Sequence, residues 1–370
     1  MKKNLAKRIL STALVCLMVA ILAGSFAGCG NSGSSGSSGS GGDTADKKFD
    51  TLNVGVLVST VGIPALYADE QGWFDEAGLD VNLIIFPTGA PVNEAIAAKQ
   101  IDVACSGFAS VYSLANANCS WIAEINTTGG MGIYARPDSP IAKATGNVPG
   151  APAILGSAET VKGAKILGPL GTSSQFAAIS YIDQLGLSET DVEQVHMEYG
   201  PGFQAFVAGE GDLISISPPY SYDCLDKGYV EVASFEDATN VLMKDGCFAR
   251  NDVIEKRSEE VELFLKVLVR AMDALGDDQV RFDYTINKYH ENAQEFTEEN
   301  MQKEIADRSY VNTVFMSDPT YVFGAAMAPI SEFLAKQGKI SEDNLPNVQK
   351  SFNASLLEKA TGLDIKVYSE

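Results

Sequence analysis

An internal repeat constrains the fold of this chain more than any other feature of its sequence. Residues 52–58 form an apolar, β-rich run, which is followed by a loop of small residues, a helical stretch and the turn Asp75–Leu79. The same order starts again at residues 164–167 and ends in the turn Asp183–Leu187. Both turns read D-x-x-G-L, and they lie 108 residues apart, from Asp75 to Asp183. A repeat of this length predicts two lobes built on one plan.

A second pair of matching segments supports the repeat. Ala95–Val103 and Ala205–Leu213 are each a helix end that turns into a strand, and they are offset by 110 residues. Each lobe is therefore predicted to be a β-α-β-α-β-α-β wind. Strands that alternate with helices favour an α/β fold with parallel-rich sheets, helices on both faces and right-handed crossovers.

Four loops rich in small and hydroxylated residues follow the predicted strands, at residues 59–62, 106–110, 171–175 and 217–220. In such sheets, ligands bind beyond the carboxyl ends of the strands, where helix N-termini present free N–H groups. Glycine lets the backbone approach a ligand, and hydroxyls both donate and accept, so these loops suit a polar or anionic head group. The alternative is that the Ser and Thr residues are only helix N-caps. The candidate ligand-binding residues are Ser59, Thr60, Val61, Ser106, Gly107, Phe108, Thr127, Gly171, Thr172, Ser173, Ser174, Pro219 and Tyr220.

The four loops lack the residues that catalysis needs. They contain no Lys, Arg, His, Asp or Glu, and no Ser–His–Asp, Cys–His or paired-carboxylate arrangement is evident in the sequence. The only histidines, His196 and His290, are far apart in the chain. We therefore expect no catalytic residue, no metal site and no cofactor. Aromatic residues after the loops could form an apolar wall for an organic ligand, or could simply pack in the core: Phe108, Tyr112, Phe176, Tyr220 and Tyr222.

The second lobe interrupts the first, so the chain must cross between the lobes twice. We expect residues 48–134 and 235–370 to form lobe 1, and residues 135–234 to form lobe 2. One crossing carries Arg136 and the return carries Arg250. Either guanidinium could hold a ligand anion, and ion pairing at a hinge or at the surface is the alternative.

The chain after residue 254 is predicted to be helical. Apolar residues at three- and four-residue steps from Val261 to Leu275 form an amphipathic stripe, which should pack on the first lobe. Residues 280–310 and 319–337 also have a helical pattern. The charge runs of this region, such as Glu259-Glu260, are predicted to be solvated faces.

The N-terminus has the features of an export signal. Four basic residues precede an apolar stretch with small residues that ends at Cys29. We predict a lipoprotein signal peptide over residues 1–28, acylation of Cys29, and a Ser/Gly tether over residues 29–47. The alternative is an uncleaved membrane anchor, because the apolar stretch is almost long enough to span a bilayer.

Charge and cysteine content narrow the function further. The chain has 27 Lys and Arg against 48 Asp and Glu, a net charge of −21, and removing the four basic residues of the signal peptide leaves −25. This balance argues against nucleic-acid binding, which needs a basic face. Four of the six cysteines remain in the exported body at positions that match no zinc framework, and buried free thiols are favoured over a disulfide: Cys105, Cys119, Cys224 and Cys247.

Several short motifs occur in one order behind the export signal. They are Gly72-Trp73-Phe74, Gly78-Leu79-Asp80-Val81, Ala98-Lys99-Gln100-Ile101-Asp102-Val103, Val161-Lys162-Gly163-Ala164-Lys165-Ile166 and Pro219-Tyr220. From about Leu52 to the helices after Ile254, the chain resembles the substrate-binding proteins of ABC importers in the nitrate, sulfonate, taurine and thiamine-precursor family. The resemblance implies a type II periplasmic-binding-protein fold, with a ligand cleft between two lobes.

The same resemblance implies a function. A small sulfonate, nitrate, taurine-like or pyrimidine solute would be captured between the lobes and passed to a membrane permease driven by an ATPase. The protein would be a monomer, anchored by its lipid to the extracytoplasmic face of the cell membrane. Two departures bear on the ligand: Ser217-Pro218 stands where many relatives have an aromatic residue and an acid, and residues 137–160 are longer than usual. The alternatives are an enzyme of the pyrimidine-synthase-like branch of this fold and a sensory receptor lipoprotein.

Overall fold

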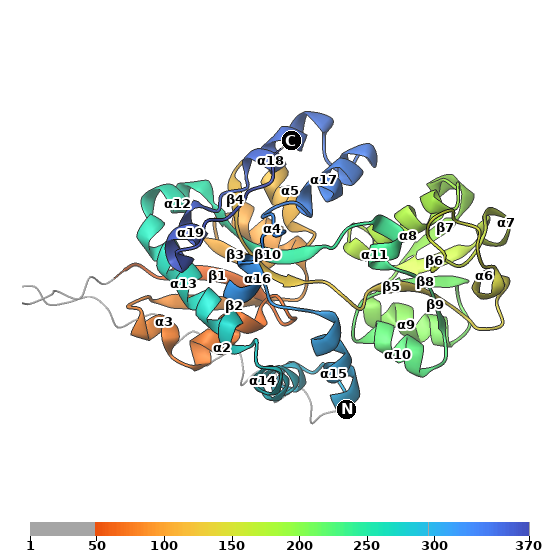
Figure 1. Ribbon diagram of the computed structural model, residues 1–370, viewed down its shortest axis with the longest axis horizontal. Helices are drawn as coiled ribbons and strands as arrows, with labels where there is room; N and C mark the ends of the chain where they lie inside the picture. The colour runs from red at the N-terminus through yellow and green to blue at the C-terminus, as the bar shows by residue number, and fades with distance from the viewer. Residues whose placement is uncertain (1–48, 295, 370) are drawn as a thin grey trace, which may run out of the picture. The chain divides into compact units, whose positions relative to one another are not determined.

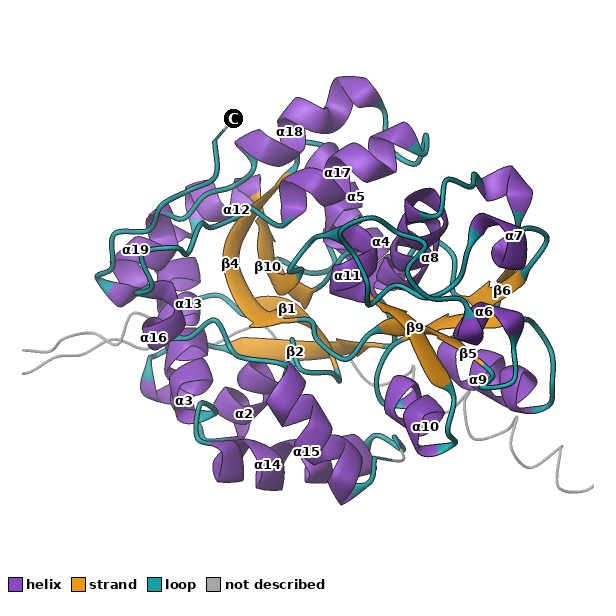
Figure 2. Ribbon diagram, turned by 45° about the vertical axis from the view of Figure 1, so that its right-hand side comes forward, coloured by secondary structure: helices purple, strands orange, loops and turns teal. Residues whose placement is uncertain are grey.

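Two five-stranded β-sheets organise the part of the chain that the structure, a computed structural model, describes: residues 49–294 and 296–369. The predicted signal peptide, Cys29 and the tether over residues 29–47 lie outside the described residues. Helices flank both sheets (Figures 1 and 2). Within the described ranges, no helix is long and apolar enough to cross a membrane, and no cluster of His, Cys, Asp and Glu could hold a metal ion.

The first sheet has the strand order β2-β1-β3-β10-β4. Strand β1 pairs in parallel with β2 and β3, whereas β10 is antiparallel to both of its neighbours. Helices α4 (Gly89–Ala97) and α5 (Ser110–Ala115) cover one face of this sheet, and α2 (Ile63–Glu70) and α13 (Ser258–Ala274) cover the other (Figure 1). The strands are Leu52–Leu57 (β1), Val81–Phe86 (β2), Val103–Ser106 (β3), Cys119–Thr127 (β4) and Lys244–Arg250 (β10).

The second sheet has the strand order β7-β6-β8-β5-β9. Strand β6 is parallel to β7 and β8, whereas β5 is antiparallel to β8 and β9. Helices α8 (Ser173–Gln184) and α11 (Phe235–Thr239) lie on one face, and α9 (Tyr199–Val207) and α10 (Tyr220–Asp226) lie on the other (Figure 1). The strands are Gly132–Ala135 (β5), Lys165–Gly168 (β6), Glu193–His196 (β7), Leu213–Ile216 (β8) and Val230–Ser234 (β9).

The two sheets correspond strand by strand, as a repeated plan requires. Strand β6 takes the place of β1, β7 of β2 and β8 of β3. In each sheet, the antiparallel strand is the one with which the chain arrives from the other sheet: β5 follows β4, and β10 follows β9. The alternating β and α elements build the parallel strands of each sheet. The single antiparallel strand is the one through which the chain enters from the other sheet.

The helices follow the predicted alternation. In the first half they are Ile63–Glu70 (α2), Trp73–Glu76 (α3), Gly89–Ala97 (α4), Ser110–Ala115 (α5), Pro140–Lys143 (α6), Ala158–Val161 (α7), Ser173–Gln184 (α8), the 3-10 turn Glu189–Asp191, Tyr199–Val207 (α9), Tyr220–Asp226 (α10) and Phe235–Thr239 (α11). After the return strand they are Asn251–Lys256 (α12), Ser258–Ala274 (α13), Asp278–Glu291 (α14), Glu298–Asp307 (α15), Thr313–Met316 (α16), Met327–Lys336 (α17), the 3-10 turn Glu342–Asn344, Leu345–Lys350 (α18) and Ser355–Thr361 (α19).

The amphipathic stripe after residue 254 is confirmed as the buried face of α13. Every apolar residue of the stripe is buried, from Val261 to Leu275. The ring of Phe264 stacks on Phe74 of α3 with centroids 5.5 Å apart. Helix α13 also packs on α2 and α19, so it ties the later chain to the first sheet.

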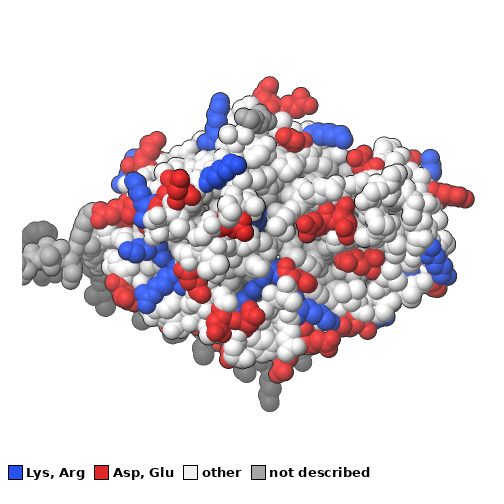
Figure 3. Space-filling model, in the orientation of Figure 1, with Lys and Arg blue, Asp and Glu red and all other residues white. Residues whose placement is uncertain are grey.

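Two details differ from the sequence expectations. Residues 319–326 are not helical, because α17 begins only at Met327. The expected solvated face at Glu259-Glu260 is wrong for Glu260, which is 8% exposed and pairs with Arg257. Elsewhere, acidic and basic side chains are intermixed on the face drawn in Figure 3.

Replacing Phe264 with Ala tests the packing of α13. We expect the free energy of unfolding to fall by about 3–5 kcal/mol, because the substitution removes a fully buried ring and leaves a cavity. Denaturant unfolding of both proteins measures the difference. Val314→Ala is the control, since Val314 is 78% exposed and its change should stay within about 0.5 kcal/mol. Equal losses in the two variants would contradict this account of the core.

Candidate functional site

The first predicted loop lies between β1 and α2, at the carboxyl end of a central strand. Thr60 and Val61 are buried, and Ser59 is partly exposed. The carbonyl of Ser59 accepts hydrogen bonds from the backbone N–H groups of Gly62 and Ile63, which fixes the turn into α2. Val61 belongs to the hydrophobic core, so the polar side chain that this loop turns inward is that of Thr60.

A buried network joins this loop to residues far away in the chain. Thr60 is 1% exposed, and its hydroxyl donates a hydrogen bond to Oε1 of Glu304. The same hydroxyl oxygen accepts a hydrogen bond of 3.0 Å from Nη1 of Arg308. Glu304 also accepts one of 2.8 Å from the hydroxyl of Tyr289. A single hydroxyl therefore links a buried cation to a buried carboxylate.

Arg308 is held by the backbone as well as by side chains. Its Nε donates to the carbonyl oxygen of Gly129 at 2.9 Å, and its own carbonyl accepts from Arg281 at 2.6 Å. Glycine is needed at 129, because a Cβ atom there would stand 2.0 Å from the carbonyl oxygen of Asp307. Burial opposes the charge of Arg308, but the nearby negative charge of Glu304 keeps the pKa of Arg308 above its ordinary value.

Asp245 brings a second carboxylate to this network from β10. It is mostly buried, and its Oδ2 accepts a hydrogen bond of 3.3 Å from the amide of Asn126. Gly107 stands opposite, where a Cβ atom would lie 2.2 Å from Oδ1 of Asp245. Burial raises the pKa of Asp245 to about 6, although Arg308 and the Asn126 bond lower it. We call Thr60, Glu304, Arg308 and Asp245 the Arg308 cluster; it holds two carboxylates and one cation.

Other predicted residues of the first half lie at the ends of β3 and β4. The backbone N–H of Thr127 donates to the carbonyl of Ser309, and its hydroxyl accepts from the N–H of Ser309, both at 2.9 Å. The hydroxyl of Ser106 is buried and has no hydrogen-bond partner among the described residues. Thr127 is thereby tied to the residue that follows Arg308.

The predicted residues of the second half form a separate group of hydroxyls. Ser174, Tyr199 and Ser217 share hydrogen bonds of 3.2 Å that meet at the Tyr199 hydroxyl. Tyr199 begins α9, Ser174 lies in the first turn of α8, and Ser217 follows β8. All three lie beyond strand ends, as the topology rule for ligands requires. Within these described contacts the group carries no charge.

The remaining predicted residues of this half are engaged locally. The hydroxyl of Thr172 donates to the carbonyl of Pro169 at 2.7 Å, and the N–H of Gly171 donates to the side chain of Gln175 at 2.8 Å. Ser173 is mostly buried at the start of α8. Pro219 follows Pro218 through a cis peptide bond, and Tyr220 packs on Phe203 with ring centroids 5.5 Å apart. These contacts shape the loops, and none of them involves the hydroxyls of Ser174, Tyr199 or Ser217.

Polar contacts connect elements of the two sheets along α10 and α15. The Tyr222 hydroxyl donates to Asp307 at 3.0 Å, and the Asn300 amide donates to Asp223 at 2.9 Å. Lys303 adds an ion pair of 2.6 Å with Asp226. The three α15 residues lie three and four positions apart, so one face of α15 meets α10.

An aromatic contact connects the two halves at a second place. Phe176 of α8 lies 5.9 Å from Phe108 and 4.2 Å from Phe333 of α17, measured between ring centroids. Phe108 and Phe176, two of the aromatic residues predicted as a possible apolar wall for a ligand, therefore pack on each other. A third, Tyr222, instead donates its hydroxyl to Asp307. Packing of the two rings brings the loop after β3 next to α8.

The two crossing arginines have structural roles. Arg250 pairs with Asp102 at 3.1 Å and Asp252 at 3.0 Å and donates to the carbonyl of Ile101. Arg136 donates to carbonyl oxygens at the end of α9 and lies 4.3 Å from the Phe206 ring centroid. Of the two interpretations that the sequence left open, these contacts match ion pairing and anchoring of the crossings.

Sequence reasoning missed Glu304, Arg308, Asp245 and Tyr199. No motif surrounds them, and the helical pattern over residues 280–310 predicts no contact for Glu304 or Arg308. One local feature marks the segment Asp307-Arg308-Ser309-Tyr310, because two charged residues at a helix end are followed closely by an aromatic residue. That signal gives no contact partner, because Thr60 and Arg308 are 248 positions apart.

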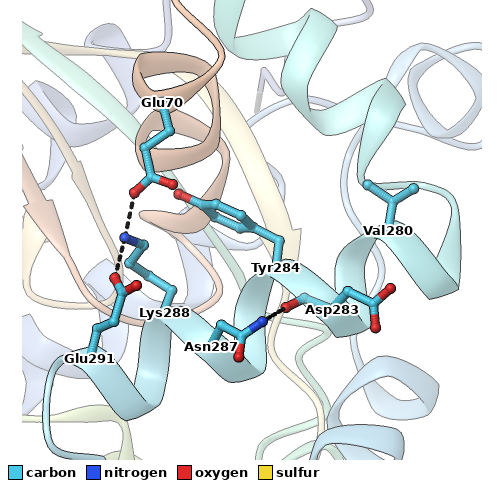
Figure 4. Close-up of a pocket in the computed structure, with 7 residues that line it drawn as sticks. All are labelled: Glu70, Val280, Asp283, Tyr284, Asn287, Lys288 and Glu291. Carbon is cyan, nitrogen blue, oxygen red and sulfur yellow. Dashed lines mark hydrogen bonds and ion pairs between the residues drawn. The ribbon is translucent and has the colours of Figure 1, made fainter.

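A hollow of about 470 Å³ lies away from all these residues, between α2 and α14 (Figure 4). Its lining includes Glu70 and Glu291, both of which pair with Lys288. The lysine is therefore already neutralised by its own neighbours. The hollow contains none of the predicted loop residues, and we assign no function to it.

Replacing Thr60 with Val tests the link between Arg308 and Glu304. The substitution keeps the shape but removes the hydroxyl, so two buried charged groups each lose a hydrogen bond. We expect the free energy of unfolding to fall by about 1–3 kcal/mol, measured by denaturant unfolding. Ser59→Ala, on the neighbouring and partly exposed residue, should stay within about 0.5 kcal/mol. An unchanged stability of the Thr60 variant would show that the network does not depend on this hydroxyl.

Solved structures of low sequence identity share the fold. The aliphatic sulphonate binding protein SsuA of Escherichia coli has a TM-score of 0.63 at 16% identity, over 80% of this chain and 91% of its own. The nitrate-binding protein NrtA of Synechocystis has a TM-score of 0.66 at 13% identity, over 84% and 88%. A Candida albicans protein described as having the generic periplasmic binding protein fold has a TM-score of 0.58 at 13% identity, over 82% and 95%. The predicted fold class is confirmed.

Sequence comparison identifies the family. Residues 59–146 match the family model described as NMT1/THI5 like. A Brachyspira hyodysenteriae protein described as an ABC transporter periplasmic binding protein is 30% identical over 312 residues, which cover 84% of this chain and 89% of that protein. At this identity and coverage, the chain belongs to the family of ABC transporter periplasmic binding proteins, and it is an extracytoplasmic solute-binding component of an importer rather than an enzyme.

Proposed function

We propose that the protein captures a small organic solute that carries N–H donors, of the pyrimidine or thiamine-precursor class, and delivers it to a membrane permease. The observation that carries this proposal is the charge balance of the Arg308 cluster. Arg308 is already linked through Thr60 to Glu304, and Asp245 adds a second negative charge. A nitrate or sulfonate would place a further negative charge beside these two carboxylates, which disfavours its binding.

Asp245 is the residue that we assign to ligand recognition. Its carboxylate faces Gly107 and is not fully buried, so a solute could reach it from the loop after β3. The buried Ser106 hydroxyl, which has no partner among the described residues, precedes Gly107. A carboxylate accepts hydrogen bonds from an amino group or a protonated ring nitrogen, and such charge-assisted bonds are the stronger ones.

The second half would contribute the uncharged side of the site. The group of Ser174, Tyr199 and Ser217 can both donate and accept, so it suits the polar edge of an organic ring. Phe108 and Phe176, which pack on each other, would form an apolar boundary beside that ring. Gly171, Thr172, Pro219 and Tyr220 remain candidate ligand-binding residues in this proposal, because they shape the loops around these hydroxyls.

Capture would occur between two lobes that close by a hinge. We assign the first sheet and its helices to lobe 1 and the second sheet to lobe 2, with the first crossing placed just before Gly132. The contacts of α15 with α10 and of Phe176 with Phe108 and Phe333 support a closed arrangement. Closure of this kind would build the surface that the permease recognises.

A ligand panel tests the solute class. We expect 4-amino-2-methylpyrimidine or cytosine to raise the melting temperature, whereas taurine, ethanesulfonate and nitrate should not. A ligand at about 100 times its dissociation constant stabilises the folded state by about 2.7 kcal/mol. Native mass spectrometry of the purified protein would identify any co-purified solute. A shift with a sulfonate or nitrate alone would overturn the proposed class but leave the binding function intact.

The same ligand should bind in a pH-dependent way. The carboxylate of Asp245 must be ionised to accept from an N–H donor, and its pKa is about 6, so affinity should fall up to about tenfold per pH unit below 6. Asp245→Asn should weaken binding and remove this dependence. Glu332→Gln, an exposed change of the same chemistry, is the control. A wild-type affinity that is constant from pH 7 to pH 5 would exclude Asp245 from the site.

We propose further that the body is anchored by lipid on Cys29. The support is the sequence pattern around this residue, since the structure does not describe residues 1–48. A Ser/Gly tether of this length would reach roughly 20 Å, enough to hold the body above the membrane. Cys29→Ser should move the protein from the membrane fraction to the soluble fraction of a cell lysate. Retention of the variant in the membrane would favour an uncleaved anchor instead.

A further inference from the structure

Two cysteines lie directly opposite each other in the first sheet. Cys105 on β3 and Cys247 on β10 are paired in antiparallel register. Directly opposed residues of an antiparallel ladder have Cα atoms about 4.5 or 5.5 Å apart, depending on their hydrogen-bond pattern. Both spacings fall within the range of about 4.4–6.8 Å that a disulfide spans. The register therefore places the two thiols within reach of a covalent bond.

The surroundings of this pair differ from those of the other described cysteines. Cys105 and Cys247 are both free and 0% exposed. Burial, together with the adjacent Cys105 thiol, raises the pKa of Cys247 well above its ordinary value. Cys119 is opposed by Arg250 on β10, and Cys224 lies in α10. Among the described strand pairings, only Cys105 and Cys247 place one cysteine against another.

We propose that Cys105 and Cys247 are a cross-strand redox pair that becomes a disulfide after export. The extracytoplasmic location of the family supports this, because thiols there meet oxidants that the cytoplasm lacks. The oxidant is a disulfide donor of the thiol–disulfide oxidoreductase class. Both sulfurs are buried in the folded protein, so the donor must reach them while the chain folds or when β10 opens locally.

The reaction is a balanced thiol–disulfide exchange. The thiolate of one cysteine attacks the donor disulfide, which forms a mixed disulfide and releases one donor thiol. The second cysteine then attacks the sulfur of the first, which forms the Cys105–Cys247 bond and releases the second donor thiol. The pair loses two electrons and two protons, and the donor takes up both.

The bond would fix the part of the first sheet that carries the proposed ligand contacts. Cys105 immediately precedes Ser106 and Gly107, and Cys247 lies two residues after Asp245. The bond would therefore hold β10 against β3 where Asp245 faces Gly107. It would also close a loop of about 140 residues that contains the whole second sheet, and long loops gain the most from closure.

Peptide mapping tests the pair directly. The full-length protein is isolated from the cell envelope without reductant, its free thiols are alkylated in denaturant, and it is digested with chymotrypsin. This protease can cut at Phe108 and Tyr112, which separates Cys105 from Cys119. We expect a linked Cys105–Cys247 peptide that disappears on reduction, with Cys119 and Cys224 alkylated. Full alkylation of both Cys105 and Cys247 would overturn the proposal.

Thermal melting gives an independent readout. Protein refolded with oxidised glutathione should melt about 5–10 °C higher than the same protein after reduction. Cys105→Ser and Cys247→Ser should each abolish this difference, whereas Cys119→Ser, which changes another buried thiol, should keep it. A reductant-sensitive melting temperature that persists in Cys105→Ser would assign the effect to another pair and overturn the proposal.

Discussion

The geometry of the candidate site depends on the burial of Arg308. A guanidinium that is 8% exposed is costly to remove from water, and it is retained only where hydrogen bonds and a nearby negative charge offset that cost. The groups that offset this cost come from three parts of the chain that are far apart in sequence. They are Thr60 after β1, the carbonyl of Gly129 in the crossing to the second sheet, and Glu304 on α15. Satisfying this one cation therefore fixes the loop after β1, the crossing and the end of α15 relative to one another.

The two halves of the proposed site consequently differ in character although the sheets repeat one plan. The first half supplies the Arg308 guanidinium and two carboxylates, whereas the second supplies the hydroxyls of Ser174, Tyr199 and Ser217. The strong net negative charge of the chain has little bearing on this contrast, because exposed charges are screened over about 10 Å whereas buried ones are screened much less. The proposed preference for a solute that donates hydrogen bonds therefore rests on the few buried groups and not on the net charge.

Local patterns made the fold predictable, but they could not reveal the Arg308 cluster. The D-x-x-G-L turns and the stripe from Val261 to Leu275 follow from periodicity within about 20 residues, and the loops after β1, β3, β6 and β8 follow from the topology of parallel sheets. Thr60 is a candidate on this ground. Its partners Glu304 and Arg308 are not, because a helix end with charged residues looks the same whether it faces solvent or a loop 244 positions away. Glu260 was misjudged for the same reason, since its pairing with Arg257 and its burial depend on what packs over the helix.

The repeat extends to the crossings, and this bears on how the lobes would move. Arg250 is the last residue of β10 and donates to the carbonyl of Ile101, and Arg136 directly follows β5 and donates to the carbonyl of Gly211. The two acceptors lie 110 positions apart, the same offset as the second pair of repeated segments, so each arriving strand is pinned at its far end in the same way. Rotation between the proposed lobes would then be taken up before β5 and between β9 and β10. Gly129 and Gly130 lie in the first of these short connections, next to Asp307 and Tyr222. A hinge at this position would couple lobe closure to the same backbone that holds Arg308.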